Sequence, residues 1–388
     1  MANLPRLGIV GLGAQGSAYA QMISDGTIPS MEIGAICDGS QAKRQVAEST
    51  YPDVQFFDDY LAMLDSGSVD AVVICVPPYL HPQIGIDALR RGIHVLLEKP
   101  AGVYTKQVKE LNEVAQTKPE LTFAIMFNQR NNPLYRAIKD LVRGGAIGQI
   151  RHTSWIITTW WRPQAYHDQS AWRATWGGEG GGVLVNQAPH QLDLWLWICG
   201  LPRSVFAKVA YGFRRAIAVE DEVTAIVDYG EGATGVFITA THDFLGTDRF
   251  EILGDHGKIV VDDSARATVM RLTKPERELS ETIDPQDVPK VLSRQLNPAD
   301  FYSSEVIEFE RRSRSQHAGI LENFAANILT GTPLIAPGVE GINSVRLANA
   351  FHLSSWTGHE VPFNFDDDHY LAELNNRIRE EGLFPERE

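Results

Sequence analysis

The chain has 388 residues, of which 44% are hydrophobic and 22% charged, so it has the composition of a globular protein and is long enough for two domains. Its net charge of −14 repels phosphate groups, and we therefore expect neither nucleic acid nor a membrane surface as a partner. The three cysteines are far apart in the sequence, which argues against a disulfide framework and against a metal cluster. With no signal-peptide pattern at the N-terminus and no apolar run long enough to span a bilayer, we expect a soluble, cytoplasmic protein.

Strand and helix signals alternate along the first third of the chain, as in a parallel sheet wrapped by helices. The stretch 69–76 is β-branched and almost continuously apolar, which is typical of a strand buried on both faces. This pattern predicts an α/β domain over residues 1–127. We expect its strands at 7–10, 31–37, 69–76, 94–97 and 121–127, and its helices from the first glycine turn to about residue 25 and at 42–49, 80–91 and 104–117.

The pattern changes after Asn128, where strand signals follow one another with few helices between them. The segment Asp255-His256-Gly257 looks like a hairpin turn. Residues 274–299 are charged and rich in proline, and we interpret them as a long surface excursion. Residues 128–388 are therefore expected to be α+β, with strands at 150–161, 204–213, 222–228, 234–241, 250–253 and 258–261 and helices from near Pro189 to Cys199 and at 316–329 and 341–356.

A glycine loop, Gly11-Leu12-Gly13-Ala14-Gln15-Gly16, lies between the first strand and the first helix. In this context a G-x-G-x-x-G loop lets the backbone approach a pyrophosphate and directs helix N–H groups at it. Asp38 ends the second strand, where a carboxylate can accept hydrogen bonds from ribose hydroxyls. A ligand-free glycine turn is the alternative, but the loop, its context and the acid together favour a dinucleotide. The expected binding residues are Gly11, Gly13, Ala14, Gln15, Gly16 and Asp38.

The same acid bears on the choice of cofactor. A carboxylate at Asp38 repels a 2′-phosphate, so we expect NAD, with NADP the less favoured cofactor. Lys43 and Arg44 are close in sequence and could offset this preference, although their expected place is the exposed face of the next helix.

Two further motifs could carry chemistry. Glu98-Lys99-Pro100 ends the fifth strand at the carboxyl edge of the sheet, where such folds bind ligands, although a solvated lysine in a turn is the structural alternative. Gly180-Gly181-Gly182 leads to Asn186, His190 and Asp193, which we expect on one face of a helix because they are spaced by four and by three residues. We interpret His190 as functional, since the glycine-rich segment leads directly to it, and Asp193 as a structural hydrogen-bond acceptor.

Seven of the eight tryptophans fall within residues 155–197. Indole rings can stack on the C–H faces of sugars, so one interpretation is a carbohydrate cleft that includes Trp161. The other interpretation, which should hold for most of the seven, is that they belong to the hydrophobic core. Arg162 and Arg173 lie in the same stretch and could reach substrate hydroxyls or an acidic partner.

The glycine loop, Glu98-Lys99-Pro100 and the glycine triplet before His190 together resemble the Gfo/Idh/MocA oxidoreductase family over essentially the whole chain. The resemblance implies a Rossmann domain at 1–127 and, at 128–388, an α+β domain whose large open, mostly antiparallel sheet serves substrate binding and oligomerisation. It also implies NAD(P)-dependent oxidation or reduction of sugars and polyols, with the family's catalytic lysine on Lys99 and its histidine on His190. On this basis we expect cofactor contacts from Pro77, His81, Glu98, Lys99 and Asn128, and substrate contacts from Lys99, Trp161, Arg162, Arg173, Asn186 and His190.

One residue departs from the family pattern. Many members have aspartate four residues before the histidine, where this chain has Asn186. An amide cannot take up a proton, but it can still exchange hydrogen bonds with a substrate hydroxyl. The tryptophan-rich lead-in and the Asn-Gln-Ala-Pro-His segment look like the branch of the family that includes levoglucosan dehydrogenase.

These features predict an NAD-dependent dehydrogenase, a homodimer or homotetramer, that oxidises a secondary hydroxyl of a sugar, anhydrosugar or polyol. His190 is the expected base, because an unperturbed imidazole titrates near ~6.5, and Lys99 would stabilise the developing negative charge. Two alternatives remain: an enzyme that retains NAD and cleaves a glycoside by transient oxidation, and a non-catalytic dinucleotide-binding sensor. The presence of both Lys99 and His190 argues against the sensor.

Overall fold

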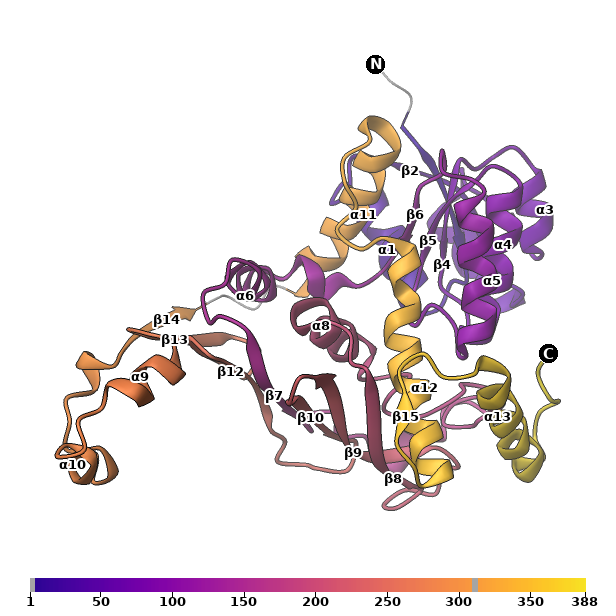
Figure 1. Cartoon of the computed structure of the whole chain (residues 1–388). Helices are drawn as coiled ribbons and strands as arrows, with labels where there is room; N and C mark the ends of the chain where they lie inside the picture. Colours follow the sequence, from indigo (N-terminus) through magenta and orange to yellow (C-terminus); the bar gives the residue numbers. More distant parts are fainter. Residues whose placement is uncertain (1–3, 309–312) are drawn as a thin grey trace.

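The computed structural model describes residues 4–308 and 313–388, and these form two sheets with helices around them (Figure 1). Residues 1–3 and 309–312, which belong to the two domains predicted above, lie outside the described part of the chain. None of the described helices combines the length and the apolar character needed to cross a bilayer.

The first sheet is parallel and has the strand order β3-β2-β1-β4-β5-β6 within the described residues. This is the doubly wound order of a dinucleotide-binding Rossmann fold, so the predicted α/β class is confirmed. Helices cover both faces, which explains why every residue of β4 is buried (Figure 1). The strands are β1 (Arg6–Val10), β2 (Glu32–Cys37), β3 (Gln55–Phe57), β4 (Ala71–Ile74), β5 (His94–Leu97) and β6 (Phe123–Ile125), and the helices are α1 (Ala14–Ser24), α2 (Gln41–Thr50), α3 (Tyr60–Asp65), α4 (His81–Arg90) and α5 (Thr105–Gln116).

Two elements of this half, β3 and α3, were not predicted from the sequence. They have three and six residues, which is too short for a hydrophobic period to stand out. Their position matters, because they follow Asp38 in the chain and form the wall beside it.

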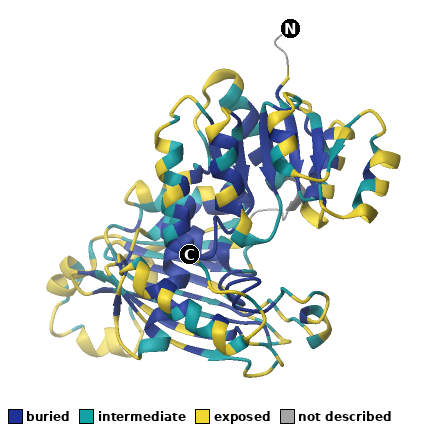
Figure 2. Cartoon of the chain, turned by 90° about the vertical axis from the view of Figure 1, so that its right-hand side faces the viewer, coloured by how far each residue is buried: buried dark blue, intermediate teal, exposed yellow. Residues whose placement is uncertain are grey.

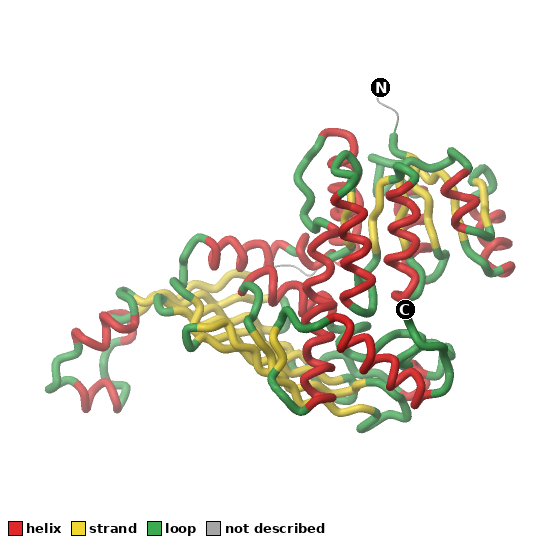
Figure 3. Tube along the Cα trace, turned by 45° about the vertical axis from the view of Figure 1, so that its right-hand side comes forward, coloured by secondary structure: helices red, strands yellow, loops and turns green. Residues whose placement is uncertain are grey.

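The second sheet is mixed but mostly antiparallel, as expected, with β10 and β7 as its parallel pair. Its strands alternate between buried and exposed residues, as in β8, where Val205, Ala207 and Val209 are buried. The helices α6 (Pro133–Arg143), α8 (Pro189–Cys199) and α12 (Gly341–Thr357) lie along one face (Figures 1 and 3). The strand order among the described residues is β14-β13-β12-β11-β7-β10-β9-β8-β15, with β7 (Ile150–Ile157), β8 (Ser204–Tyr211), β9 (Glu220–Gly230), β10 (Ala233–Ala240), β11 (Asp248–Gly254), β12 (Gly257–Asp262), β13 (Arg266–Leu272), β14 (Tyr302–Glu308) and β15 (Val361–Pro362).

The predicted hairpin and the predicted surface excursion are both confirmed. Asp255 and His256 form the turn between β11 and β12, which pair antiparallel. The excursion joins β13 to β14 through α9 (Glu276–Thr282) and α10 (Val288–Leu292), whose residues are all partly or fully exposed, and it projects from the far end of the sheet (Figure 1). The prediction was wrong for the end of β7, which stops at Ile157 rather than at residue 161, and it lacked α6, β13 and β14.

The C-terminal helices connect the two halves. Helix α11 (Ser313–Thr330) returns to the first sheet, where Ile320, Leu321 and Phe324 belong to the same buried cluster as the parallel strands. Helix α12 then leads back to the second sheet, and Figure 2 shows that buried residues continue along it. The chain ends with α13 (Asp367–Glu381) and a short tail.

Candidate active site

A cavity of about 720 Å³ lies at the carboxyl edge of the first sheet, where α/β folds bind their ligands. One end is formed by the glycine loop and Asp38, and the other by Lys99 and the segment that approaches α8. Its lining includes Gly11, Gly13, Ala14, Gln15, Asp38, Asp58, Asp59, Tyr60, Pro77, His81, Glu98, Lys99, Trp172, Arg173, Glu179 and Asn186.

The glycine loop has the shape needed to hold a pyrophosphate. Gly11 has a φ of +93°, and a Cβ there would lie 2.6 Å from the carbonyl oxygen of Cys75. Around Gly13, by contrast, no described atom lies within 4 Å of a Cβ position, which leaves room for a ligand against the backbone. Gly13 is also the N-cap of α1 and has no side chain to satisfy the first helical N–H groups, so these remain available to phosphate oxygens. Gly16 is outside the lining, and it allows α1 to pack closely against Gly11.

Asp38 is held at the cavity by backbone hydrogen bonds. Its Oδ2 accepts from Leu12 N at 2.8 Å and its Oδ1 accepts from Ser40 N at 2.9 Å. Arg44, which could have favoured a 2′-phosphate, points elsewhere: it is 2.5 Å from Asp58 and lies over the ring of Phe56. This end of the cavity therefore presents carboxylates rather than free cations, which suits the unphosphorylated ribose of NAD.

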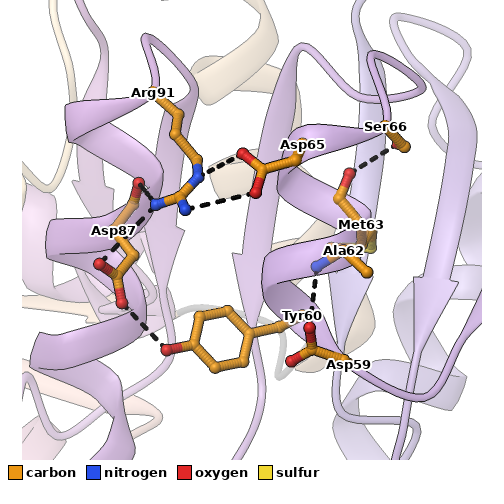
Figure 4. Close-up of polar contacts among 8 residues, drawn as sticks. All are labelled: Asp59, Tyr60, Ala62, Met63, Asp65, Ser66, Asp87 and Arg91. Atoms are coloured by element: carbon orange, nitrogen blue, oxygen red, sulfur yellow. Dashed lines mark hydrogen bonds and ion pairs between the residues drawn. The ribbon is translucent and has the colours of Figure 1, made fainter.

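Helix α3 forms the wall next to Asp38 and is tied to α4 (Figure 4). Asp59 caps α3 by accepting a hydrogen bond from Ala62 N at 3.0 Å. Tyr60 donates its hydroxyl to Asp87 at 2.9 Å, and Arg91 binds Asp65 at 2.7 Å. These contacts hold Asp59 and Tyr60 at the cavity, a position that the sequence analysis did not identify.

Lys99 is fixed by contacts from both halves of the protein. Its Nζ donates to the main-chain oxygen of Asn186 at 2.9 Å, and its backbone N–H donates to Glu98 Oε2 at 3.0 Å. The other oxygen of Glu98 accepts a short hydrogen bond from the buried hydroxyl of Tyr19. Burial lowers the pKa of Lys99, while the carboxylates of Glu98 and Glu179 oppose this shift.

His190 lies on α8, edge-on to Phe127 at 6.4 Å between ring centroids and near enough to Lys99 to feel its charge, but it is not among the described residues that line the cavity. Its Nδ1 is buried and makes no hydrogen bond with any described residue. Burial, reinforced by the positive charge of Lys99, lowers the pKa of His190 well below 6.5, so the imidazole is neutral at physiological pH.

The expectation that Asn186, His190 and Asp193 share one helical face was wrong. Helix α8 begins at Pro189, so Asn186 precedes it and turns its side chain to the buried carboxylate of Glu179. Asp193 binds Arg130 through both oxygens, at 2.6 and 2.8 Å, which confirms its structural role.

The tryptophan-rich stretch contributes less to the cavity than a sugar cleft would require. Trp155, Trp176 and Trp195 are core residues, as expected for most of the group. Trp161 is 37% exposed, packs on Phe244 and is not among the described residues that line the cavity. Arg162 is also absent from the described lining, and its guanidinium donates hydrogen bonds to the carbonyl groups of Trp160 and Trp161.

Arg173 is in the lining, together with Trp172. Its guanidinium lies over the rings of Trp172 and Tyr166 and donates to the Tyr166 hydroxyl at 2.8 Å, which holds the side chain in place. The residues in this part of the cavity lining that the sequence analysis did not single out are therefore Trp172 and Glu179.

The remaining expected cofactor residues divide between the cavity and the core. His81 lines the cavity, and its ring nitrogens each lie 2.7 Å from a main-chain oxygen, those of Pro100 and Val76. Pro77 lines it as well. Asn128 is 3% exposed, lies behind this surface and contacts His317. No group of three or more metal-binding side chains occurs in residues 4–308 and 313–388.

Comparison with known proteins agrees with this geometry. The model of the oxidoreductase family with an NAD-binding Rossmann fold matches residues 5–125, and the model of the GFO/IDH/MocA C-terminal domain matches residues 135–260. The chain belongs to the Gfo/Idh/MocA oxidoreductase family. It is an NAD-binding oxidoreductase, as the family models and the glycine loop both indicate.

Members of the Gfo/Idh/MocA family with related sequences or structures include dehydrogenases. Inositol 2-dehydrogenase of Rhizobium meliloti is 24% identical over 89% of this chain and 95% of its own length. The WlbA dehydrogenase of Bordetella pertussis, solved with NADH and UDP-GlcNAcA, is 26% identical with a TM-score of 0.76, over 94% of this chain and 100% of that one. Levoglucosan dehydrogenase, solved with NADH and levoglucosan, has a TM-score of 0.77 at 18% identity over 93% and 100% of the two chains, which shows a shared fold.

Proposed function

We propose that this Gfo/Idh/MocA oxidoreductase oxidises a secondary hydroxyl of a sugar, anhydrosugar or polyol with NAD as the hydride acceptor. The observation that carries the proposal is the continuity of the cavity, from the glycine loop and Asp38 at one end to Lys99 and Asn186 at the other. A substrate at the second end would be held beside the nicotinamide of a dinucleotide at the first. The names of the related inositol 2-dehydrogenase and levoglucosan dehydrogenase support this substrate class.

The substrate end suits an uncharged polyhydroxy compound. Lys99 and Arg173 offer hydrogen-bond donors, the side-chain oxygen of Asn186 offers an acceptor, and Glu179 places a negative charge near Lys99 and Arg173. The ring of Trp172 provides an apolar surface for sugar C–H groups.

Bound NAD supplies the carbon that accepts the hydride, and the protein must take the hydroxyl proton. We assign this proton to Lys99 Nζ. Support comes from burial, which lowers the pKa of Lys99 toward the operating pH, where a general base is most effective. His190 was the expected base, but a group whose pKa lies well below 6.5 has little tendency to accept a proton from an alcohol. Its neutral imidazole would instead hold the hydroxyl oxygen through a hydrogen bond.

The experiment is a panel of inositols, sugars, anhydrosugars and glycosides incubated with NAD, with NADH followed by its absorbance. We expect NADH to accumulate with at least one polyol or sugar. Release of sugar from a glycoside without NADH would indicate the NAD-retaining lyase or hydrolase chemistry instead. Tight NAD binding with no turnover across the panel would indicate a sensor.

We also propose a homodimer or homotetramer formed through the uncovered face of the second sheet. Large apolar residues such as Phe206 and Ile226 are 46% and 49% exposed there, which is unusual for a face left in water. Size-exclusion chromatography with light scattering measures the mass of the protein in solution, and the mass of a monomer would contradict the proposed oligomer.

A further inference from the structure

A buried carboxylate stands next to the position where many Gfo/Idh/MocA enzymes have aspartate and this chain has Asn186. Glu179 is 3% exposed, and its Oε1 accepts a short hydrogen bond from Asn186 Nδ2. Its Oε2 accepts from Ala174 N at 2.7 Å. The carboxylate also lies 3.9 Å from Arg173 and lines the same cavity as Lys99.

Hydrogen bonds to the backbone anchor the segment that carries Glu179. Ala174, which donates to the carboxylate, has a φ of +55°, a backbone conformation that an alanine adopts when its surroundings require it. Glu381 accepts hydrogen bonds from Trp176 N at 2.8 Å and Gly177 N at 3.2 Å, which ties the segment to α13.

Burial raises the pKa of Glu179, but the hydrogen bonds from Ala174 and Asn186 and the charges of Arg173 and Lys99 oppose this shift and stabilise the carboxylate. A carboxylate accepts hydrogen bonds and does not donate them, and this decides how the amide of Asn186 is oriented. If the amide turned over, its oxygen would face the oxygen of Glu179, and two acceptors would meet in a buried place. The NH₂ group therefore faces Glu179. Asn186 Oδ1 makes no hydrogen bond with any other described residue and is left for a ligand in the cavity.

We propose that Glu179 is a specificity-determining positioning residue: it holds the Asn186 amide with its oxygen toward the substrate, so that the site requires a second hydroxyl on the substrate as a hydrogen-bond donor. This rests on the proposed function and adds one requirement to it: besides the hydroxyl that is oxidised, the substrate must carry a second, free hydroxyl. A carbonyl, an ether or a fluorine at the second position cannot donate, and the site rejects it.

The variant Glu179→Gln tests the orientation without changing the size of the side chain. Glutamine has one oxygen and one NH₂ group, but Glu179 serves two donors, Ala174 N–H and Asn186 NH₂. If the glutamine oxygen keeps the bond from Ala174, its NH₂ faces Asn186, and the Asn186 amide must turn over. The matched control is Glu113→Gln, an exposed glutamate of α5 far from these contacts.

The first readout is the side-chain amide resonance of Asn186 in protein labelled with ¹⁵N-asparagine, identified by its loss in Asn186→Asp. In the wild type we expect one amide proton resonance of Asn186 to be shifted downfield by the charged acceptor. This resonance should move upfield in Glu179→Gln and stay unchanged in Glu113→Gln. An unchanged resonance in Glu179→Gln would overturn the proposal. This measurement needs no substrate, so it tests the orientation of the Asn186 amide even if the panel above finds no turnover.

The second readout is discrimination between the best polyol of that panel and its monodeoxyfluoro analogues, whose fluorine cannot donate. We expect the wild type to lose at least about 100-fold in kcat/KM with one analogue, because a site built to bind a hydroxyl rejects its replacement strongly. The loss should fall below about tenfold in Glu179→Gln. Equal discrimination by the two proteins, or a wild type that accepts every analogue, would contradict the proposal.

Discussion

Arg130 and Asp193 form a two-point ion pair inside the protein, with Arg130 Nη2 at 2.6 Å from Asp193 Oδ1 and Nε at 2.8 Å from Oδ2. The two side chains are 3% and 2% exposed. Arg130 follows the last strand of the first sheet, whereas Asp193 lies on α8 one turn after His190. The pair therefore ties the helix that carries His190 to the segment that directly follows the last strand of the first sheet.

Asp193→Ala should lower the free energy of unfolding by about 3–5 kcal/mol, because it leaves the guanidinium of Arg130 buried with one remaining carboxylate partner, Glu340. Urea denaturation followed by tryptophan fluorescence measures the change. Glu281→Ala, which removes the partner of the exposed Arg277, is the control and should leave the midpoint unchanged. Equal shifts in the two variants would contradict the role given to burial.

Lys99→Ala should lower kcat by at least about 100-fold, since it removes the group assigned to take the hydroxyl proton. The dissociation constant for NADH, measured by fluorescence titration, should change less than about threefold, because the glycine loop and Asp38 are untouched. Weakened NADH binding with normal turnover at saturation would show that Lys99 serves the cofactor instead.

The pH dependence of kcat/KM should show an acidic limb that belongs to Lys99. Burial lowers the pKa of this amine below the 10.5 of a free lysine, so its neutral, proton-accepting form appears at a lower pH. Activity should therefore rise with pH through that pKa and then level off. The charged groups that act on the amine are Glu98, Glu179 and Arg173. Since arginine stays protonated, residual activity of Lys99→Arg should lack this limb, and a limb of unchanged position would assign it to another group.

The wild type should prefer NAD to NADP by about tenfold or more, because Asp38 would face a 2′-phosphate at close range. Replacing both Asp38 and Asp58 by asparagine should reduce this preference further than Asp38→Asn alone, since it also releases Arg44 from its ion pair. The measurement is kcat/KM with each cofactor for the wild type, for Asp38→Asn and for the double variant. A wild type that prefers NADP would show that Arg44 and Lys43 govern the pocket.

Glu381→Ala should raise the KM for the substrate several-fold while leaving NADH binding unchanged. The carboxylate accepts hydrogen bonds from Trp176 N and Gly177 N, and without it the segment that carries Arg173 and Glu179 loses its anchor. Glu381→Gln keeps an acceptor and should behave nearly as the wild type does. If glutamine were as damaging as alanine, the charge of Glu381 and not its hydrogen bonds would be responsible.

The parts of the fold that could be predicted have local signals in the sequence. A stretch of about ten residues is enough to predict each of three elements: the glycine loop, the buried strand β4 and the helix that ends before Gly92. The sequence analysis overlooked two equally local signals. One is the alternation along β13, whose residues alternate between buried and exposed in the structure, and the other is the Asn132-Pro133 start of α6.

The site was harder to predict because it depends on contacts between distant segments. Asn186 and His190 have helical spacing, but Pro189 fits the first turn of a helix, so α8 begins there and Asn186 lies outside it. Glu179 reaches Asn186 through an irregular segment whose path is set by glycines and by Glu381. Glu381 binds Trp176 in this segment, although the two residues are 205 positions apart in the sequence. No periodic pattern carries such information.

The return of α11 to the first sheet has a consequence for how the protein is made. Ile320, Leu321 and Phe324 complete the packing of strands that leave the ribosome much earlier. The strands of the cofactor-binding half are thus synthesised first, but the core around them is complete only when α11 has been synthesised. A nascent chain that ends before α11 has a sheet with part of its apolar surface uncovered. The two halves of this enzyme cannot be exchanged between relatives as simple N-terminal and C-terminal cassettes, because a graft at the end of β6 separates the first core from buried residues that come later in the chain, among them Ile320, Leu321 and Phe324.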